Sequence, residues 1–353
     1  MVQKTLYAML LLVPITLVLH FLDIGGHSLI FVFSALSLVP LAGVLGDATE
    51  QTAIYTGPRA GALLNATFGN FAELIIAFAA LREGLNDVVR ASIAGSIIGN
   101  ILIVLGASLL VGGLRNGIQT FDPRAASANA TMMTLAVIAL AVPGLFWLTD
   151  ADGVSLGRHE VERLSDGVAI VMLVLYACFL YFTLFEPRGA MSEADADEAA
   201  TMSLRMAIGL LIVATIAVVL MSEILVGVIE PTAESWGLSD IFIGLILIPL
   251  VGNVAEHLVA VRRRTSNDMD LSMGIALGSG LQVALFVSPV LVLLGEFINK
   301  PIPMIFNTWE LIALVAAVLL AVAISQDGES NWLEGAQLIG VYTILATAFF
   351  FAG

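Results

Sequence analysis

The chain has 353 residues, of which 59% are hydrophobic and 12% are charged, and its mean hydropathy is +0.99. A soluble domain of this length cannot bury so much apolar surface, so we expect most of that surface to face lipid. The net charge of −15 gives no basic footprint for nucleic acid, and the single cysteine, Cys178, excludes an intrachain disulfide. The composition therefore predicts an all-α polytopic membrane protein in a lipid bilayer.

Apolar runs of about 20 residues, separated by charges, proline and glycine, predict eleven transmembrane helices. The runs cover 5–22, 28–45, 59–81, 88–111, 125–148, 167–185, 204–228, 241–261, 271–294, 309–324 and 332–351. The longest interruption is an acidic stretch after the sixth run. We therefore divide the chain into a peripheral first helix (1–26), a five-helix repeat (27–186), an acidic linker (187–202) and a second five-helix repeat (203–353).

The basic residues predict the orientation in the membrane. Eleven spans place the two chain ends on opposite sides, and nine of the 14 basic residues fall on the side of the N-terminus. These nine are Lys4, Arg59, Arg115, Arg124, Arg188, Arg205, Arg262, Arg263 and Arg264. The positive-inside tendency then predicts that the N-terminus and the acidic linker are cytoplasmic. The compact loops favour a prokaryotic plasma membrane.

An acidic motif occurs once in each predicted repeat. The sequence GNFAE at 69–73 returns as GNVAE at 252–256, a spacing of 183 residues. The same spacing relates Gly95 to Gly278 and Ser96 to Ser279 on the following helix. Because each repeat has an odd number of spans, the second enters the membrane inverted relative to the first. Inverted repeats place the substrate near the membrane midplane, on helices interrupted by glycine or proline.

Each position of this motif suits the binding of a cation. An acid at membrane depth is costly, so Glu73 and Glu256 are expected to be functional. Gly69 and Gly252 weaken each helix one turn earlier and free a backbone oxygen, the ligand type that hard cations prefer. Asn70 and Asn253 lie three residues before each glutamate, so in a continuous helix they share its face. Further neutral oxygens, which coordinate or simply pack between helices, are offered by Asn70, Asn253, Ser96, Asn100, Ser279 and Gln282.

The charge of the paired acids indicates a mechanism. Two facing carboxylates with little water repel each other, so an empty pair is expected to take up protons. A site that holds either a divalent cation or protons becomes an antiporter once it alternates between the two membrane faces. His257 is a candidate to tune Glu256 or to relay protons, although it also fits a packing role. Glu50 and Glu230 are candidates to collect cations at the two mouths, or are ordinary interfacial acids.

These residues resemble a known family. The sequences around 69–75 and 252–257, together with DATE at 47–50, LNAT at 64–67 and ALGSGLQVALF at 276–286, are similar to those of the calcium/proton exchangers of the calcium/cation antiporter superfamily. The resemblance implies Ca²⁺ and H⁺ as transported ions without a cofactor, Glu73 and Glu256 as ion-binding acids, and backbone oxygens near Gly69 and Gly252 as ligands. Two departures are Gly99, where the family often has serine, and the short linker.

Other functions are weaker alternatives. A sodium/calcium exchanger of the same superfamily usually has proline beside the repeat acid, whereas Ala72 and Ala255 stand there in this chain. An intramembrane metal-dependent enzyme would need a motif such as His-Glu-x-x-His, which the sequence lacks. A channel does not need two acids that must stay occupied. The sequence leaves a homo-oligomer open, and we do not expect an enzyme.

Overall fold

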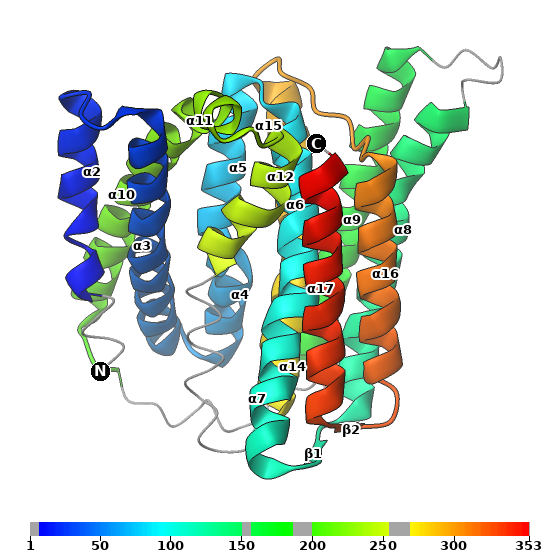
Figure 1. Ribbon diagram of the computed structural model, residues 1–353. Coiled ribbons are helices and arrows are strands. Elements are labelled where there is room, and N and C mark those ends of the chain that lie inside the picture. The colour runs from blue at the N-terminus through cyan, green and yellow to red at the C-terminus, as the bar shows by residue number, and fades with distance from the viewer. Residues whose placement is uncertain (1–6, 150–156, 186–199, 254–268, 353) are drawn as a thin grey trace.

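The computed structural model describes residues 7–149, 157–185, 200–253 and 269–352, and these residues are mostly helical (Figure 1). Near the N-terminus, α2 (Leu12–Phe21) packs beside α3 at one edge of the molecule. The first half continues with α3 (Gly26–Thr56), α4 (Pro58–Phe68), α5 (Phe71–Glu83), α6 (Asn86–Gly99), the π-helix η1 (Asn100–Leu105), α7 (Gly106–Asn116), β1 (Gln119–Thr120), α8 (Pro123–Thr149) and α9 (Arg158–Phe185).

The second half has a similar series of helices. It comprises α10 (Leu204–Gly227), α11 (Ile229–Trp236), α12 (Asp240–Phe242), the π-helix η4 (Ile243–Leu247), α14 (Met269–Gln282), the π-helix η6 (Val283–Val287), α15 (Ser288–Phe297), α16 (Thr308–Ile324), β2 (Glu329–Ser330) and α17 (Trp332–Ala352). The two strands pair antiparallel, so the turn between α7 and α8 lies beside the turn between α16 and α17.

Most of these helices suit a membrane. Within the described part of the chain, eight helices are long and apolar enough to span a bilayer, and one further pair is bent by 113° between Ile229–Trp236 and Asp240–Asn253. Two shorter apolar helices, Tyr7–Phe21 and Thr308–Ile324, fall where the first and tenth spans are predicted. The protein is therefore an all-α polytopic membrane protein, and the total of eleven spans stays a prediction.

The two halves are alike in local structure and opposite in direction. The π-helices η1 and η6 begin at Asn100 and Val283, 183 residues apart, which is the spacing of the sequence repeat. The first long helices of the halves, α3 and α10, lie side by side. Tyr55, near the end of α3, donates a hydrogen bond to the carbonyl of Met202, just before α10. The end of α3 therefore meets the beginning of α10, and the two helices run antiparallel.

The α3 helix continues beyond the predicted span at 28–45 and ends at Thr56. Its last three turns are polar in sequence, so hydropathy ends the run too early. One side of the extension is nevertheless buried: Thr49 is 1% exposed, and its hydroxyl donates to the Leu45 carbonyl of the same helix. Packing against α4 and α10 stabilises this polar extension as part of the helix.

The two halves cross closely where α6 passes η4. A Cβ atom built on Gly95 of α6 would overlap the carbonyl oxygen of Leu245 and lie 2.7 Å from Pro249 Cγ. On the facing helix, a Cβ on Gly244 would lie 2.8 Å from Ala91 Cβ. Small residues let membrane helices approach to backbone contact. This crossing places the segment before Asn253 against the first half of the chain.

Candidate functional site

The predicted cation motif of the first half lies at a break in a transmembrane helix. The α4 helix ends at Phe68 and α5 begins at Phe71, with Asn70 between them at φ −104° and ψ 28°. Glu73 is therefore in the first turn of α5, where free N–H groups and the helix dipole stabilise a negative charge. The carbonyl end of α4 faces the same break and offers oxygen ligands, as half-helices do in transporters. Gly69 itself keeps helical dihedrals of φ −55° and ψ −46°, and the backbone leaves helical geometry one residue later, at Asn70.

The Asn70 side chain connects the break to α14 and, through Ser279, to Asn100 of η1. Its Nδ2 donates to Gln282 Oε1 at 2.6 Å, and its Oδ1 accepts from Ser279 Oγ at 2.9 Å. Asn100 Nδ2 in turn donates to Ser279 Oγ at 3.1 Å. Asn70 is 2% exposed and Asn100 is fully buried, so these bonds form away from water. The network ties the break before Glu73 to α14 of the other half.

The sequence places Asn70 on the helical face of Glu73, and this expectation is wrong. Asn70 lies outside both half-helices because the backbone leaves helical geometry at this residue. Its amide side chain therefore pairs with Gln282 and Ser279 of α14. Four of the predicted polar residues, Asn70, Asn100, Ser279 and Gln282, do gather here in one hydrogen-bond network.

The second motif meets the first at Gly252. A Cβ atom built on Gly252 would lie 3.3 Å from Glu73 Oε1, so the backbone of the second half lies directly against the carboxylate. The next residue, Asn253, is 1% exposed, and neither polar atom of its side chain has a hydrogen-bond partner among the described residues. Its Nδ2 would lie 3.7 Å from a Cβ on Gly99. Gly99 stands 183 residues before Gln282 and is therefore its equivalent in the first half, but it has no side chain that could bind Asn253 as Gln282 binds Asn70. The two asparagines thus have unequal surroundings.

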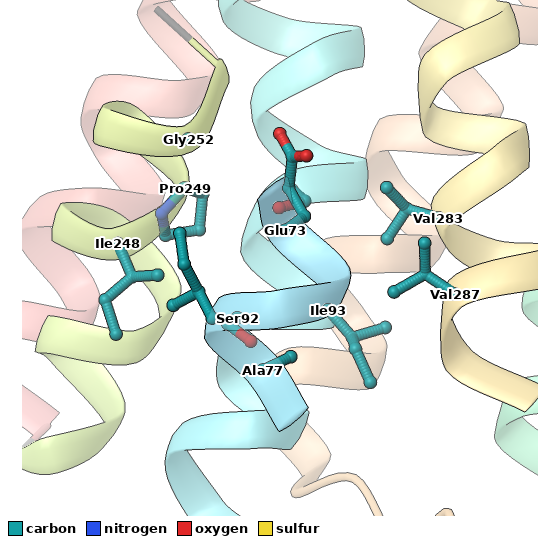
Figure 2. A pocket seen from close by; sticks show the side chains of 11 residues that line it. Glu73, Ala77, Ser92, Ile93, Ile248, Pro249, Gly252, Val283 and Val287 are labelled. Carbon is teal, nitrogen blue, oxygen red and sulfur yellow. The ribbon is translucent and has the colours of Figure 1, made fainter. Parts of the chain in front are cut away.

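A small cavity adjoins the Glu73 side chain. Its volume is about 10 Å³, which is room for one water at most. Figure 2 shows Glu73 between the segment that carries Ile248, Pro249 and Gly252 and the helix that carries Val283 and Val287. Ser92 and Ser96 of α6 add hydroxyl groups to a mostly apolar lining. The partly buried carboxylate therefore faces a nearly dry space at the junction of the two halves.

The remaining predicted site residues have different outcomes. Ser96 lines the cavity beside Glu73, as expected of a neighbouring oxygen. Glu230 is exposed in the first turn of α11, and Glu50 is half-buried in α3. Glu256 and His257 lie outside the described residues, so their predicted roles stay predictions. Among the described residues, no three His, Cys, Asp or Glu side chains form a group that could hold a metal ion.

Two residues near the site were missed from the sequence. Ser92 lines the cavity, and its position one turn before Ser96 on α6 is a signal that could have identified it. Tyr176 of α9 donates its hydroxyl to the Ala66 carbonyl of α4 at 2.9 Å. No local pattern around Tyr176 distinguishes it from the other aromatic residues of its apolar run.

Replacing Gln282 with leucine should lower the affinity of the predicted cation site by about tenfold. The change leaves the buried Asn70 Nδ2 donor without its partner, and an unmet buried donor costs about 1–3 kcal/mol. The measurement is the cation concentration that gives half-maximal uptake into proteoliposomes. Gln337→Leu on the exposed side of α17 is the matched control and should behave as the wild type does. An unchanged half-maximal concentration for Gln282→Leu would show that the Asn70 network does not shape the site.

The fold and the site together define a polytopic helical membrane transporter, built from two related halves around an acid at a helix break. A family model described as sodium/calcium exchanger protein matches residues 27–185 and 206–351, nearly the whole chain. The chain belongs to this family.

Relatives and solved structures agree with this assignment. The Ca(2+)/H(+) antiporter of Aphanothece halophytica is 42% identical over 361 residues, which cover 98% of this chain and 96% of that protein. The Ca(2+)/H(+) antiporter ChaA of Bacillus subtilis is 42% identical over 329 residues, which cover 92% of each protein. The structure of native YfkE matches with a TM-score of 0.85 at 39% identity, covering 98% of this chain and 99% of that one.

Proposed function

We propose that this chain is a Ca²⁺/H⁺ antiporter that exports cytoplasmic Ca²⁺ in exchange for external protons by alternating access. The observation that carries the proposal is the contact between the two halves, in which the Glu73 carboxylate lies against Gly252 at a helix break. Relatives at 42% identity over most of the chain are named Ca²⁺/H⁺ antiporters, which supports this pair of ions. Transport of ions accounts for the site, so we expect no enzymatic reaction and no cofactor.

Oxygen atoms near Glu73 suit Ca²⁺, which takes six to eight oxygen ligands. The carboxylate supplies charge, and the carbonyl end of α4 near Gly69 and the amide oxygens of Asn70 and Asn253 supply neutral ligands. Asn253 supports this role because its side chain is buried and has no partner among the described residues. The backbone at Gly252, which closely approaches Glu73, completes the proposed set.

Glu256 is proposed as the second carboxylate of the site. It follows Gly252 by four residues, as Glu73 follows Gly69, and Gly252 already stands against Glu73. Two carboxylates neutralise one Ca²⁺, and the same pair without Ca²⁺ favours protons because two nearby anions in a dry space repel each other. Ca²⁺ and protons then exclude each other, which is the requirement for exchange. His257 is proposed to assist proton movement at Glu256.

The proposal includes an arrangement of the chain in the membrane. The N-terminus and the linker at 187–202 are cytoplasmic, the repeats at 27–186 and 203–353 surround the site, and the helix at 1–26 is peripheral. Glu50 and Glu230, near the ends of α3 and in α11, attract cations at the two mouths. The bacterial relative from Bacillus subtilis supports a prokaryotic plasma membrane, and a homo-oligomer of this chain is compatible with every step.

Purified protein in liposomes that contain a Ca²⁺ dye tests this function. We expect an imposed pH gradient, acidic inside, to drive Ca²⁺ uptake in sodium-free buffer, because protons leaving the vesicle are exchanged for Ca²⁺. A protonophore that collapses the pH gradient should stop the uptake when the membrane potential is held near zero by equal potassium concentrations and a potassium ionophore. Protein-free liposomes under the same gradient are the control for leak.

Two results would contradict the proposal. Uptake driven only by an outward sodium gradient would favour a sodium/calcium exchanger. Uptake that follows the Ca²⁺ gradient alone, with no response to pH or sodium, would favour a channel.

A further inference from the structure

The break between α4 and α5 leaves carbonyl groups at the end of α4 without their helical N–H donors, and these groups need other hydrogen-bond donors. The last regular bond of α4 runs from the Gly69 N–H to the Asn65 carbonyl, and the next runs from the Leu74 N–H to the Asn70 carbonyl. In a continuous helix, the Asn70 N–H would donate to the carbonyl of Ala66, four residues earlier. In this structure, the Ala66 carbonyl instead accepts the hydroxyl of Tyr176 at 2.9 Å.

Tyr176 reaches the site from a helix that supplies no other residue to it. It lies on α9 and is 5% exposed, so its hydroxyl must find a partner inside the protein. Its ring lies 5.6 Å from the ring of Phe286 in η6, one helical turn after Gln282. The side chain thus touches the break of the first half and the helix that holds Asn70 from the second half.

A second contact between α4 and α9 lies nearer the beginning of α4. The guanidinium of Arg59 lies over the ring of Phe185, 4.8 Å from its centre, and such cation–π contacts stabilise a pair modestly. With Tyr176 bound at Ala66, α4 is attached to α9 close to both of its ends. The α5 half-helix packs instead on α10 and α6, so the two half-helices are held by different neighbours.

We propose that Tyr176 is a positioning residue for cation binding, a role that rests on the proposed function. Its hydroxyl occupies the acceptor that an uninterrupted helix would use, and it thereby keeps α4 and α5 broken at Gly69 and Asn70. The break leaves Asn70 free to pair with Gln282 and Ser279, and it holds Glu73 in the first turn of α5. Tyr176 acts on the cation through Ala66 and Asn70 and does not itself bind the cation.

A purely structural role predicts a different phenotype. If the hydroxyl serves only to satisfy itself inside the protein, its loss lowers stability and the amount of active protein, and the affinity for Ca²⁺ stays the same. If the hydroxyl positions the break, its loss lets Ala66 accept from Asn70 instead, and the binding residues shift. The affinity for Ca²⁺ then falls while the turnover of the loaded carrier is largely kept.

The test is Tyr176→Phe, which keeps the ring against Phe286 and removes only the hydroxyl. We expect the Ca²⁺ concentration for half-maximal, pH-driven uptake to rise about threefold to tenfold, as expected for one lost buried hydrogen bond. The maximal rate per folded protein should change by less than about twofold, and added Ca²⁺ should raise the Tm of the variant less than that of the wild type. Tyr181→Phe, on an exposed part of the same helix, should match the wild type in all three measurements.

Two outcomes overturn the inference. The first is an unchanged half-maximal Ca²⁺ concentration in Tyr176→Phe, with or without a lower Tm. The second is an equal rise in Tyr181→Phe, which would mean that the effect does not come from the Ala66 bond. A wild-type protein without pH-driven Ca²⁺ uptake would instead refute the proposed function, so the two failures are distinguishable.

Discussion

Replacing Glu73 with glutamine is expected to lower proton-driven Ca²⁺ uptake by about 100-fold or more. Glutamine has almost the same shape, so the half-helix α5 and the contact with Gly252 are retained, but the negative charge and the proton-binding group are lost. Removing one partner of a charge pair inside a protein costs about 3–5 kcal/mol, and each 1.4 kcal/mol is a factor of ten in binding. The measurement is the initial rate of Ca²⁺ uptake into proteoliposomes at a fixed pH gradient.

Glu83→Gln is the matched control for this variant. Glu83 ends the same helix, is exposed, and takes the same chemical change. It should retain the wild-type rate, which would show that the loss in Glu73→Gln comes from the site and not from the removal of any acid. Glu256→Gln should reproduce the loss of Glu73→Gln if both acids bind the same ion. Substantial Ca²⁺/H⁺ exchange by Glu73→Gln would refute the proposed mechanism.

Replacing Gly95 with alanine should impair the protein far more than replacing Gly278, its equivalent in the second half. A methyl group on Gly95 would overlap the Leu245 carbonyl, so α6 and η4 must move apart, and overpacking of this kind costs about 1–3 kcal/mol. The same movement carries Gly252 away from Glu73, and a displacement of about 1 Å in a positioned site costs up to about 100-fold. We therefore expect a lower Tm and at least about tenfold slower Ca²⁺ uptake.

Gly278→Ala provides the control because a Cβ atom on Gly278 would meet nothing within 4 Å. Each variant adds one methyl group to the wild type, at positions 183 residues apart. The change in helix propensity and in composition is therefore the same in both. Both quantities, Tm and initial rate, should stay near the wild-type values in Gly278→Ala. If the two alanine variants lose Tm and rate equally, the close crossing of α6 and η4 does not hold the site together.

Some of the site follows from local sequence and some does not. A break near Gly69 could be predicted because glycine lowers helix stability, and the importance of Glu73 could be predicted because an acid in an apolar run is costly. The pairing of Asn70 with Gln282 could not be predicted, because Gln282 is 212 residues away. The sequence around Gln282 also does not indicate which side of its helix faces Asn70. The sequence-based expectation that Asn70 shares the face of Glu73 failed because it assumed an unbroken helix.

By itself, the sequence determined the membrane class, the approximate positions of the apolar helices, and a duplication that marks Gly69 and Glu73. These features depend on composition, hydropathy and spacing, which are properties of neighbouring residues or of a constant offset. Only the tertiary structure decided that Gly252 stands against Glu73, that Gly95 and not Gly278 is a close crossing, and that Tyr176 binds the Ala66 carbonyl. In lipid, helices associate through close packing and individual hydrogen bonds rather than through an apolar stripe, so the local pattern does not specify which faces meet.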